Sequence, residues 1–346
     1  MEPLIQIVNP VESSGWDDAM RRWPEATVFH TQGWARALAD VYGFTPCYAV
    51  CRDAGEVSAV MPLMEVRGWM RGTKAVALPF TDYCPALVTR PADLHCLFHE
   101  AFDLAHARGW QSVEFRGPVV TSHDSMAEAR YFVHDLDLSG SPVDLWSRCR
   151  PDVRRAVRKA HQHHLQVHAG IDDSFIEDFC RLQTMTRRRH GLPPQPRAFF
   201  RALQRHVLQT GHGVVMTVSH NKKTVAAAIF LRFGERALFK YGASDVGAQA
   251  LRPNDLLMWE GIRWAHAHGC HVLSLGKTHP DHEGLRRFKL GWGTRESTLE
   301  YYRFDVRTSA YVKGTRSLRR WQNELFKRMP PPVLEWTGKY LYRYAT

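Results

Sequence analysis

The sequence predicts a mixed α/β protein built from two copies of one domain. Residues 105–117 read AHARGWQSVEFRG and residues 265–277 read AHAHGCHVLSLGK, each the end of a helix followed by a glycine and a short strand. Upstream of each lie two apolar stretches around a polar turn, CYAVCRDAGEVSAVMPLM (47–64) and VVMTVSHNKKTVAAAIFLRF (214–233), which is typical of a β-hairpin. A repeat this long indicates duplicated domains rather than a solenoid.

Each copy is expected to hold a mixed, mostly antiparallel sheet flanked by helices. Gly109 and Gly269 suit the residue that follows a helix end, where glycine is favoured. The break SGSPVD predicts an N-terminal domain at 1–145 and a C-terminal domain at 146–305. A basic, aromatic helical tail is expected at 306–346, with MPPPV (329–333) separating two short helices.

Composition is that of a soluble globular protein, with 44% hydrophobic and 23% charged residues. No apolar run approaches the roughly 18 residues of a membrane span, and the N-terminus lacks a signal-peptide pattern. The seven cysteines form no CxxC pair, and the 19 histidines lack the spacing of a zinc site. We therefore expect a cytoplasmic protein with reduced thiols and no metal.

The formal net charge of +11 suggests a negatively charged partner. Arg150, Arg154 and Arg158 recur every four residues and share one helical face, which suits phosphate binding or is a solvated surface. The tail combines basic residues with Trp336 and Tyr340. It therefore suits the inner face of an anionic membrane, where the protein would be peripheral, or it packs on the protein body.

The stretch LSLGKTHPDHEGLRRFKLGWG (273–293) contains a Gly-Lys-Thr that resembles the end of a phosphate-binding P-loop. That motif needs a first glycine five residues before Gly276, where His271 stands. The preceding residues read as a strand, and a turn rich in His, Pro and Asp follows. The sequence therefore argues against a P-loop nucleotide hydrolase.

The ordered motifs RRAVRKA, YGASD, PNDLLMWEGIRWAHAHG, LGKT and GLRRFKLGWG, with FHTQGWARAL and LPFTDYCPAL in the first half, resemble the FemABX-like transferases. These are tandem GNAT-fold proteins, and the similarity is greatest to the branch associated with exopolysaccharide and cell-envelope gene clusters. The resemblance implies amide-bond formation without a metal, a tightly bound cofactor or a covalent enzyme intermediate. An acyl or aminoacyl group, the latter often carried by tRNA, would pass to an amine of an envelope or polysaccharide precursor.

The resemblance also implies site residues. Phe288 and Lys289 match the family's Phe-Lys pair, in which the lysine stabilises the carbonyl oxyanion and the phenylalanine positions the acceptor; the alternative for Lys289 is a solvated helix residue. Lys277 and Arg286 would hold a phosphate. The other substrate-binding positions expected at the strand ends of the second copy are Tyr241, Ser244 and Asn254. Asn254 also suits an N-cap, which the sequence favours for it.

The general base is left open by the sequence. Where some relatives carry an acid after the first domain's strand, this chain has Arg116, which we expect to bind substrate. Asp82 is an alternative catalytic group and Tyr83 an alternative substrate ligand, or the two form a structural hydrogen bond.

Two other functions remain open. An acyl-CoA-dependent N-acyltransferase would normally carry Gln/Arg-x-x-Gly-x-Gly/Ala, but LQTGHG and FKLGWG have Leu208 and Phe288 at the first position. This absence favours aminoacyl-tRNA as the donor without excluding acyl-CoA. A non-catalytic scaffold that binds precursors or RNA is the third reading. An amino sugar and a peptide amine are equally open as acceptors.

Overall fold

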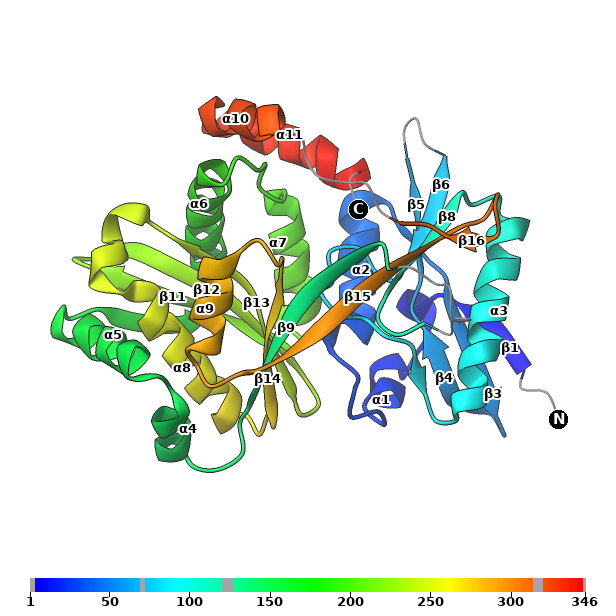
Figure 1. Cartoon of the computed structure of the whole chain (residues 1–346), viewed down its shortest axis with the longest axis horizontal. Helices are drawn as coiled ribbons and strands as arrows, with labels where there is room; N and C mark the ends of the chain where they lie inside the picture. The colour runs from blue at the N-terminus through cyan, green and yellow to red at the C-terminus, as the bar shows by residue number, and fades with distance from the viewer. Residues whose placement is uncertain (1–3, 69–71, 120–126, 314–319, 345–346) are drawn as a thin grey trace. The chain divides into compact units, whose positions relative to one another are not determined.

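The computed structural model describes residues 4–68, 72–119, 127–313 and 320–344 and divides the chain into two compact units. Unit 1 comprises residues 1–132, 298–316 and 343–346, and unit 2 comprises 133–297 and 317–342. The chain passes between the units inside two long strands, β9 (Ala129–Asp137) and β15 (Arg295–Asp305) (Figure 1). The sequence repeat predicts two duplicated domains with boundaries at 145 and 305. That domain division stays a prediction.

Unit 1 contains two sheets and three α-helices among its described residues. One sheet is antiparallel throughout, in the order β1-β3-β4-β7, and the predicted hairpin at 47–64 is its β3-β4 pair. The other has the order β15-β8-β6-β5-β2, with only β6 and β8 parallel. The elements are β1 (Leu4–Val8), α1 (Trp16–Met20), α2 (Gln32–Tyr42), β2 (Thr45–Pro46), β3 (Tyr48–Asp53), β4 (Glu56–Met61), β5 (Met64–Arg67), β6 (Thr73–Val76), β7 (Leu87–Val88), α3 (Pro91–Ala107), β8 (Ser112–Arg116) and β16 (Ala310–Tyr311).

Unit 2 holds a sheet of order β10-β11-β12-β13-β14-β9. The strands β10 to β13 are antiparallel, and the predicted hairpin at 214–233 is β11-β12. β13 and β14 run parallel, and their register joins only Arg236–Leu238 to Val272–Ser274. The elements are α4 (Pro142–Arg148), α5 (Pro151–Gln162), β10 (Gln166–Gly170), α6 (Asp173–Arg189), α7 (Arg197–Leu203), β11 (Gly213–His220), β12 (Lys223–Phe233), β13 (Arg236–Ser244), α8 (Pro253–Ala267), β14 (Val272–Thr278) and α9 (Glu283–Leu290).

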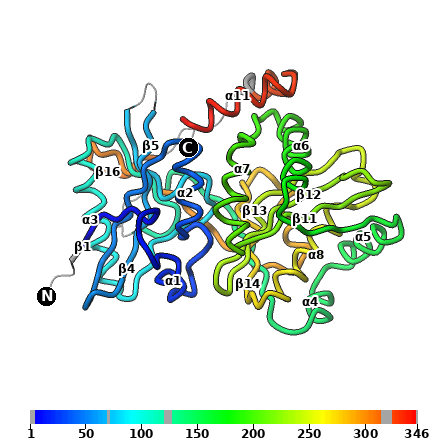
Figure 2. The backbone as a smooth tube through the Cα atoms, turned by 180° about the vertical axis from the view of Figure 1, so that it is seen from behind, coloured from blue at the N-terminus to red at the C-terminus, as the bar shows by residue number. Residues whose placement is uncertain are grey.

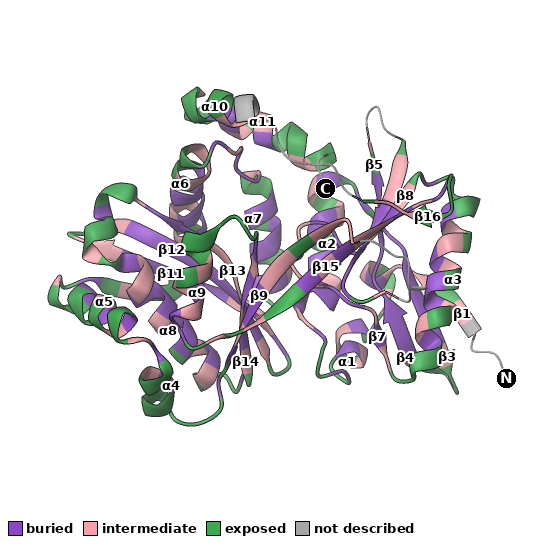
Figure 3. Ribbon diagram, in the orientation of Figure 1, coloured by how far each residue is buried: buried purple, intermediate pink, exposed green. Residues whose placement is uncertain are grey.

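Helices cover both faces of the unit 2 sheet. Successive residues of a strand point to opposite faces, so each face presents side chains on which helices pack. Phe230 of β12 meets α8, where its ring lies against Gly261. Tyr241, which pairs with Phe230's neighbour Ile229, instead packs on Phe200 of α7 at 5.4 Å between ring centroids. Figure 1 shows α8 and α9 on one side, and Figure 2, from behind, shows α6 and α7 on the other. The buried residues run through the strands between them (Figure 3).

Local signals in the sequence correctly predicted the glycines that follow two of the helices. Gly109 and Gly269, the residues that follow α3 and α8 by two positions, have φ of 63° and 71°, the left-handed region that glycine enters at little cost. The predicted tail helices are present as α10 (Arg320–Arg328) and α11 (Pro331–Tyr344). In the described residues, no helix has the length and apolar composition needed to cross a bilayer.

Candidate functional site

The segment that holds the predicted catalytic pair is helix α9, and its Lys289 is 3% exposed. The Lys289 ammonium donates to the backbone carbonyls of Gly276 at 2.8 Å and Lys277 at 3.1 Å. These carbonyls belong to the end of β14, where Gly276 has a φ of 71°. The ammonium therefore fastens α9 to β14 and is not a solvated surface charge. Its oxyanion role stays a prediction.

Arg286, one turn before Lys289, is held by a carboxylate. Its guanidinium donates twice to Glu296, at 2.7 and 2.6 Å, and Glu296 lies 2.9 Å from Nε2 of the fully buried His134. Burial and the neighbouring Lys289 ammonium lower the pKa of His134, so that this imidazole favours its neutral form. The Arg286–Glu296–His134 chain was not foreseen from the sequence, in which these residues lie far apart. It joins α9 to β15 and β9.

A groove of about 410 Å³ lies between α5, the start of α8 and α9. Four cationic side chains line it, Arg155, Lys159, Arg252 and Arg287, against two carboxylates. No described residue forms a hydrogen bond or ion pair with the side chains of Arg155, Lys159 and Arg287. The full lining comprises Asp152, Val153, Arg155, Ala156, Lys159, Arg252, Asp255, Gly284, Arg287, Phe288 and Gly291. An open cationic groove of this size suits a phosphate-bearing ligand.

The two acids of the groove, Asp152 and Asp255, reduce its positive charge to different degrees. Burial raises the pKa of Asp255 to about 6, against an ordinary value near 4, and the nearby Asp152 adds to this. Asp152 is itself held by two hydrogen bonds from Arg150. The groove therefore keeps an excess of cationic side chains, four against at most two ionised carboxylates.

The predicted basic face of α5 is not the face that lines the groove. Arg150 pairs with Asp152 at 2.7 Å, Arg154 donates to the Ser147 carbonyl at 3.4 Å, and Arg158 lies 5.9 Å above the Trp146 ring. Each helical residue turns by about 100°, so that Arg155 and Lys159 project to a different side. An anion-binding role for Arg150, Arg154 and Arg158 stays a prediction. Arg155 and Lys159 belong to the same basic stretch of the sequence, but the four-residue spacing does not single them out.

Ser244 of β13 and Asn254 of α8, two of the predicted residues, form a local hydrogen-bonded group with Thr186 of α6. Ser244 is buried; its hydroxyl accepts from the Asn254 side chain at 3.1 Å, and its backbone N–H donates to Thr186 at 3.1 Å. The predicted N-cap role of Asn254 is wrong, since α8 begins one residue earlier at Pro253 and Arg252 occupies the cap position without a side-chain hydrogen bond. Proline is favoured at the first position of a helix, so α8 starts at Pro253 and Asn254 lies inside its first turn.

In unit 1, the Arg116 side chain is buried and contacts backbone carbonyls of the same unit. It donates to the carbonyls of Leu78 and Thr81, both at 3.0 Å, and twice to Glu114. Burial opposes its charge, yet Glu114 raises the pKa of Arg116 above its ordinary value. These contacts favour a structural role, and the substrate-binding role stays a prediction.

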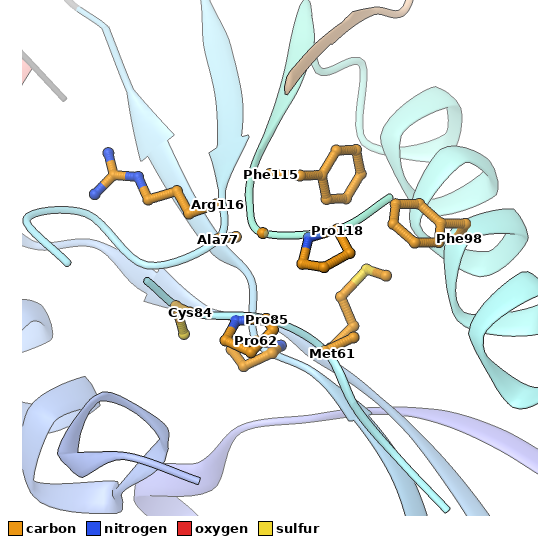
Figure 4. A pocket seen from close by; sticks show the side chains of 11 residues that line it. Met61, Pro62, Ala77, Cys84, Pro85, Phe98, Phe115, Arg116 and Pro118 are labelled. Carbon is orange, nitrogen blue, oxygen red and sulfur yellow. The ribbon is translucent and has the colours of Figure 1, made fainter. Parts of the chain in front are cut away.

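The loop that carries Asp82 and Tyr83 is anchored from β15. The Tyr301 hydroxyl donates to the Asp82 carbonyl at 2.5 Å, and both Asp82 and Tyr83 are half-buried. The adjoining cavity of unit 1 measures only about 10 Å³, room for about one water. In Figure 4 the Arg116 guanidinium points away from the proline and aromatic rings of this cavity.

A family model described as an acetyltransferase (GNAT) domain matches residues 147–296 of the chain. These residues include α5, the β10–β14 sheet and α9, and therefore both the cationic groove and Lys289. The chain therefore contains a GNAT acetyltransferase domain, which supports an acyltransferase or aminoacyltransferase activity. The mixed α/β fold predicted from the sequence is confirmed.

Solved structures with the same architecture cover nearly the whole chain. FemX is 15% identical with a TM-score of 0.67, over 87% of this chain and 97% of that one. A tandem GNAT protein from the clavulanic acid biosynthesis pathway is 11% identical with a TM-score of 0.56, over 88% and 99%. L-PGS from Bacillus licheniformis is 11% identical with a TM-score of 0.55, over 94% and 100%. No curated protein matches the chain. The resemblance to FemABX-like tandem-GNAT proteins is confirmed at the level of fold and GNAT domain.

Proposed function

We propose that the protein forms an amide bond by moving an acyl or aminoacyl group from a phosphate-bearing donor to an amine of a cell-envelope or exopolysaccharide precursor. The observation that carries this proposal is the groove beside α9. Three of its cations have no partner among the described residues, and Phe288 at its edge is the sequence neighbour of Lys289.

Phosphate binding is favourable here because Arg155, Lys159 and Arg287 form no ion pair with any described residue that a ligand would first have to break. Charge-assisted hydrogen bonds between such side chains and phosphate are roughly twice as strong as neutral ones. Both donor classes carry phosphates, on the RNA backbone or on coenzyme A. The groove would hold that part of the donor and leave the acyl end near α9.

The chemical step is a direct attack. The amine nitrogen bonds to the acyl carbon, and the carbonyl oxygen takes up negative charge. The bond to the leaving oxygen of a tRNA ester, or to the leaving sulfur of a thioester, then breaks, and the amine proton ends on that leaving group. In this proposal Lys289 supplies positive charge at the oxyanion, where a buried ammonium acts with little solvent screening. Phe288 contacts the reactants at the groove's edge.

Aminoacyl-tRNA is the first donor candidate, because the glycine-containing segments LQTGHG and FKLGWG lack the expected Gln or Arg. Acyl-CoA is the second. Its support is the similar clavulanic acid pathway protein, whose structure is described as being without AcCoA. For an aminoacyl donor, tRNA and an envelope precursor would be the partners.

Calorimetric titration tests the groove with three ligands: coenzyme A, acetyl-CoA and an aminoacylated acceptor-stem RNA. We expect micromolar, saturable binding of the RNA that weakens at least tenfold in R155Q/K159Q. The matched control R205Q/K222Q also removes one exposed Arg and one exposed Lys from unit 2, outside the groove, and should bind within twofold of wild type. Binding of the coenzyme A ligands alone would select the second donor. No binding by the folded protein would overturn the proposal.

Lys289 needs two variants, because it also fastens α9 to β14. We expect K289M to lose at least about 100-fold in turnover, the scale of one lost oxyanion donor, while RNA affinity is kept. K289R, which retains the charge, should recover part of the turnover. Unfolding curves of both variants separate catalysis from folding. A folded K289M with normal turnover would contradict the catalytic role, and absence of turnover in wild type with intact binding would favour the scaffold.

A further inference from the structure

Helix α11 shows an aromatic face to solvent. Val333, Trp336 and Tyr340 are 47%, 62% and 49% exposed, and the Trp336 and Tyr340 rings lie 4.6 Å apart. Spacings of three and four residues put these side chains on one side of the helix. We call Val333, Trp336 and Tyr340 the α11 face.

The opposite side of α11 is fixed to the body of unit 2. Leu334 is fully buried, Glu335 accepts from Thr184 at 2.9 Å, and the Tyr342 hydroxyl donates to the Pro193 carbonyl at 3.3 Å. Gly338 lies so close to Pro194 that an added Cβ would come within 2.1 Å of its carbonyl oxygen. The packing predicted as one alternative for the tail is thus present, and it leaves the α11 face outward.

Exposed apolar residues concentrate on this part of the chain. Among the described residues, six of the ten large hydrophobic side chains that are exposed fall in α10 and α11. They are Leu325, Val333, Trp336, Tyr340, Leu341 and Tyr344. A concentration of this kind indicates a contact surface, whereas single exposed hydrophobic residues need no explanation.

Charge selects the kind of partner. The exposed Arg328 and Lys339 belong to the same two helices, and both acids of these helices already have partners. Glu324 pairs with Lys327 at 2.6 Å, and Glu335 faces inward to Thr184 and Arg197. A second copy on this face would bring like charges together, which an anionic surface would not.

We infer that the α11 face docks on the surface of an anionic phospholipid bilayer, with the helix lying flat in the interface. Trp and Tyr favour the headgroup region, and basic side chains are attracted to an anionic leaflet. Fourteen residues give α11 a length of about 21 Å, enough for in-plane contact. This inference rests on α10 and α11 and does not depend on the proposed reaction.

Co-sedimentation of the full chain with lipid vesicles tests the docking. We expect binding to vesicles of equal phosphatidylglycerol and phosphatidylcholine, little binding to pure phosphatidylcholine, and at least a tenfold loss of partitioning in W336S/Y340S. R328Q/K339Q should lose severalfold and show a weaker salt dependence. The matched control V143S/V246S replaces two exposed hydrophobic residues elsewhere in unit 2 and should bind as wild type.

Three results would overturn the inference. They are no binding of wild type to the anionic vesicles, equal binding to both vesicle types, and equal binding of wild type and a folded W336S/Y340S. Sedimentation velocity without lipid measures the oligomeric state of wild type and of W336S/Y340S. A dimer that W336S/Y340S abolishes would assign the α11 face to a second copy and contradict membrane docking.

Discussion

His30 shows how a single buried side chain ties the stability of unit 1 to pH. It is fully buried, its Nδ1 lies 3.1 Å from the Thr27 N–H, and its Nε2 lies 3.1 Å from the Pro85 carbonyl. These contacts use Nδ1 as an acceptor and Nε2 as a donor, which is the neutral imidazole. Burial, only partly offset by the backbone hydrogen bonds, lowers the pKa of His30 to about 4.

Because the folded-state pKa lies below the ordinary value of about 6.5, the unfolded chain takes up the proton first as pH falls. Stability is therefore complete above pH 6.5 and declines towards pH 4, at up to about 1.4 kcal/mol per pH unit from His30. Urea unfolding at pH 7.5, 6 and 5 measures this decline. His30→Gln should be less stable at pH 7.5 and show a shallower decline. Equal slopes in both proteins would mean that His30 is not held neutral.

Unit 1 contains two arginine–glutamate ion pairs that can be compared, Arg116 with Glu114 and Arg130 with Glu300. The side chains of Arg116 and Glu114 are 7% and 12% exposed, whereas that of Arg130, which pairs with Glu300, is 72% exposed. Arg116→Met should cost about 3–5 kcal/mol of unfolding free energy, since it removes the hydrogen bonds that Arg116 donates to Glu114 and to two carbonyls. Arg130→Met should cost less than about 1 kcal/mol. Similar losses in chemical denaturation would contradict the structural role of Arg116.

Two glycines test the packing of helices in unit 2. An added Cβ at Gly261 of α8 would lie 2.0 Å from the Phe230 ring, whereas at Gly284 of α9 it would meet nothing within 4 Å. Gly261→Ala should therefore destabilise the fold by about 1–3 kcal/mol through overpacking. Gly284→Ala should stabilise it by about 0.5–1 kcal/mol through the helical preference of alanine. Thermal unfolding gives both signs, and a neutral Gly261→Ala would mean that α8 shifts freely on β12.

Element boundaries were predictable where a local rule decides them. The two hairpins and the glycines after α3 and α8 depend on residues close in sequence, and the structure has them as expected. Asn254 was misassigned as a cap because Pro253 already starts α8. The face of α5 that lines the groove could not be predicted, because it depends on residues outside the four-residue spacing. That spacing selects Arg150, Arg154 and Arg158. These three contact Asp152, the Ser147 carbonyl and the Trp146 ring, whereas Arg155 and Lys159 line the groove.

At the scale of the whole molecule, the net charge of +11 must be separated from the groove itself. R155Q/K159Q and R205Q/K222Q each lower the charge by two, from +11 to +9, and should elute equally early from a cation-exchange column. Only R155Q/K159Q should lose affinity for the acceptor-stem RNA, with a smaller slope of log affinity against log salt because fewer counterions are released. If both variants lost affinity alike, general charge rather than the groove would hold the RNA.

The sequence by itself determined the mixed α/β class, the two hairpins, the glycines that follow α3 and α8 and the resemblance to tandem-GNAT transferases, since these depend on short-range patterns and on the order of motifs. Only the tertiary structure decided which charges are used. Lys289 is enclosed against β14, Arg286 is bound by Glu296, and Arg116 by Glu114. Partners ten residues or more apart cannot be read from spacing, because the fold alone brings Glu296 to Arg286 and gives Arg155 no partner among the described residues. Burial and pairing, not residue type, separate a structural cation from one that can bind.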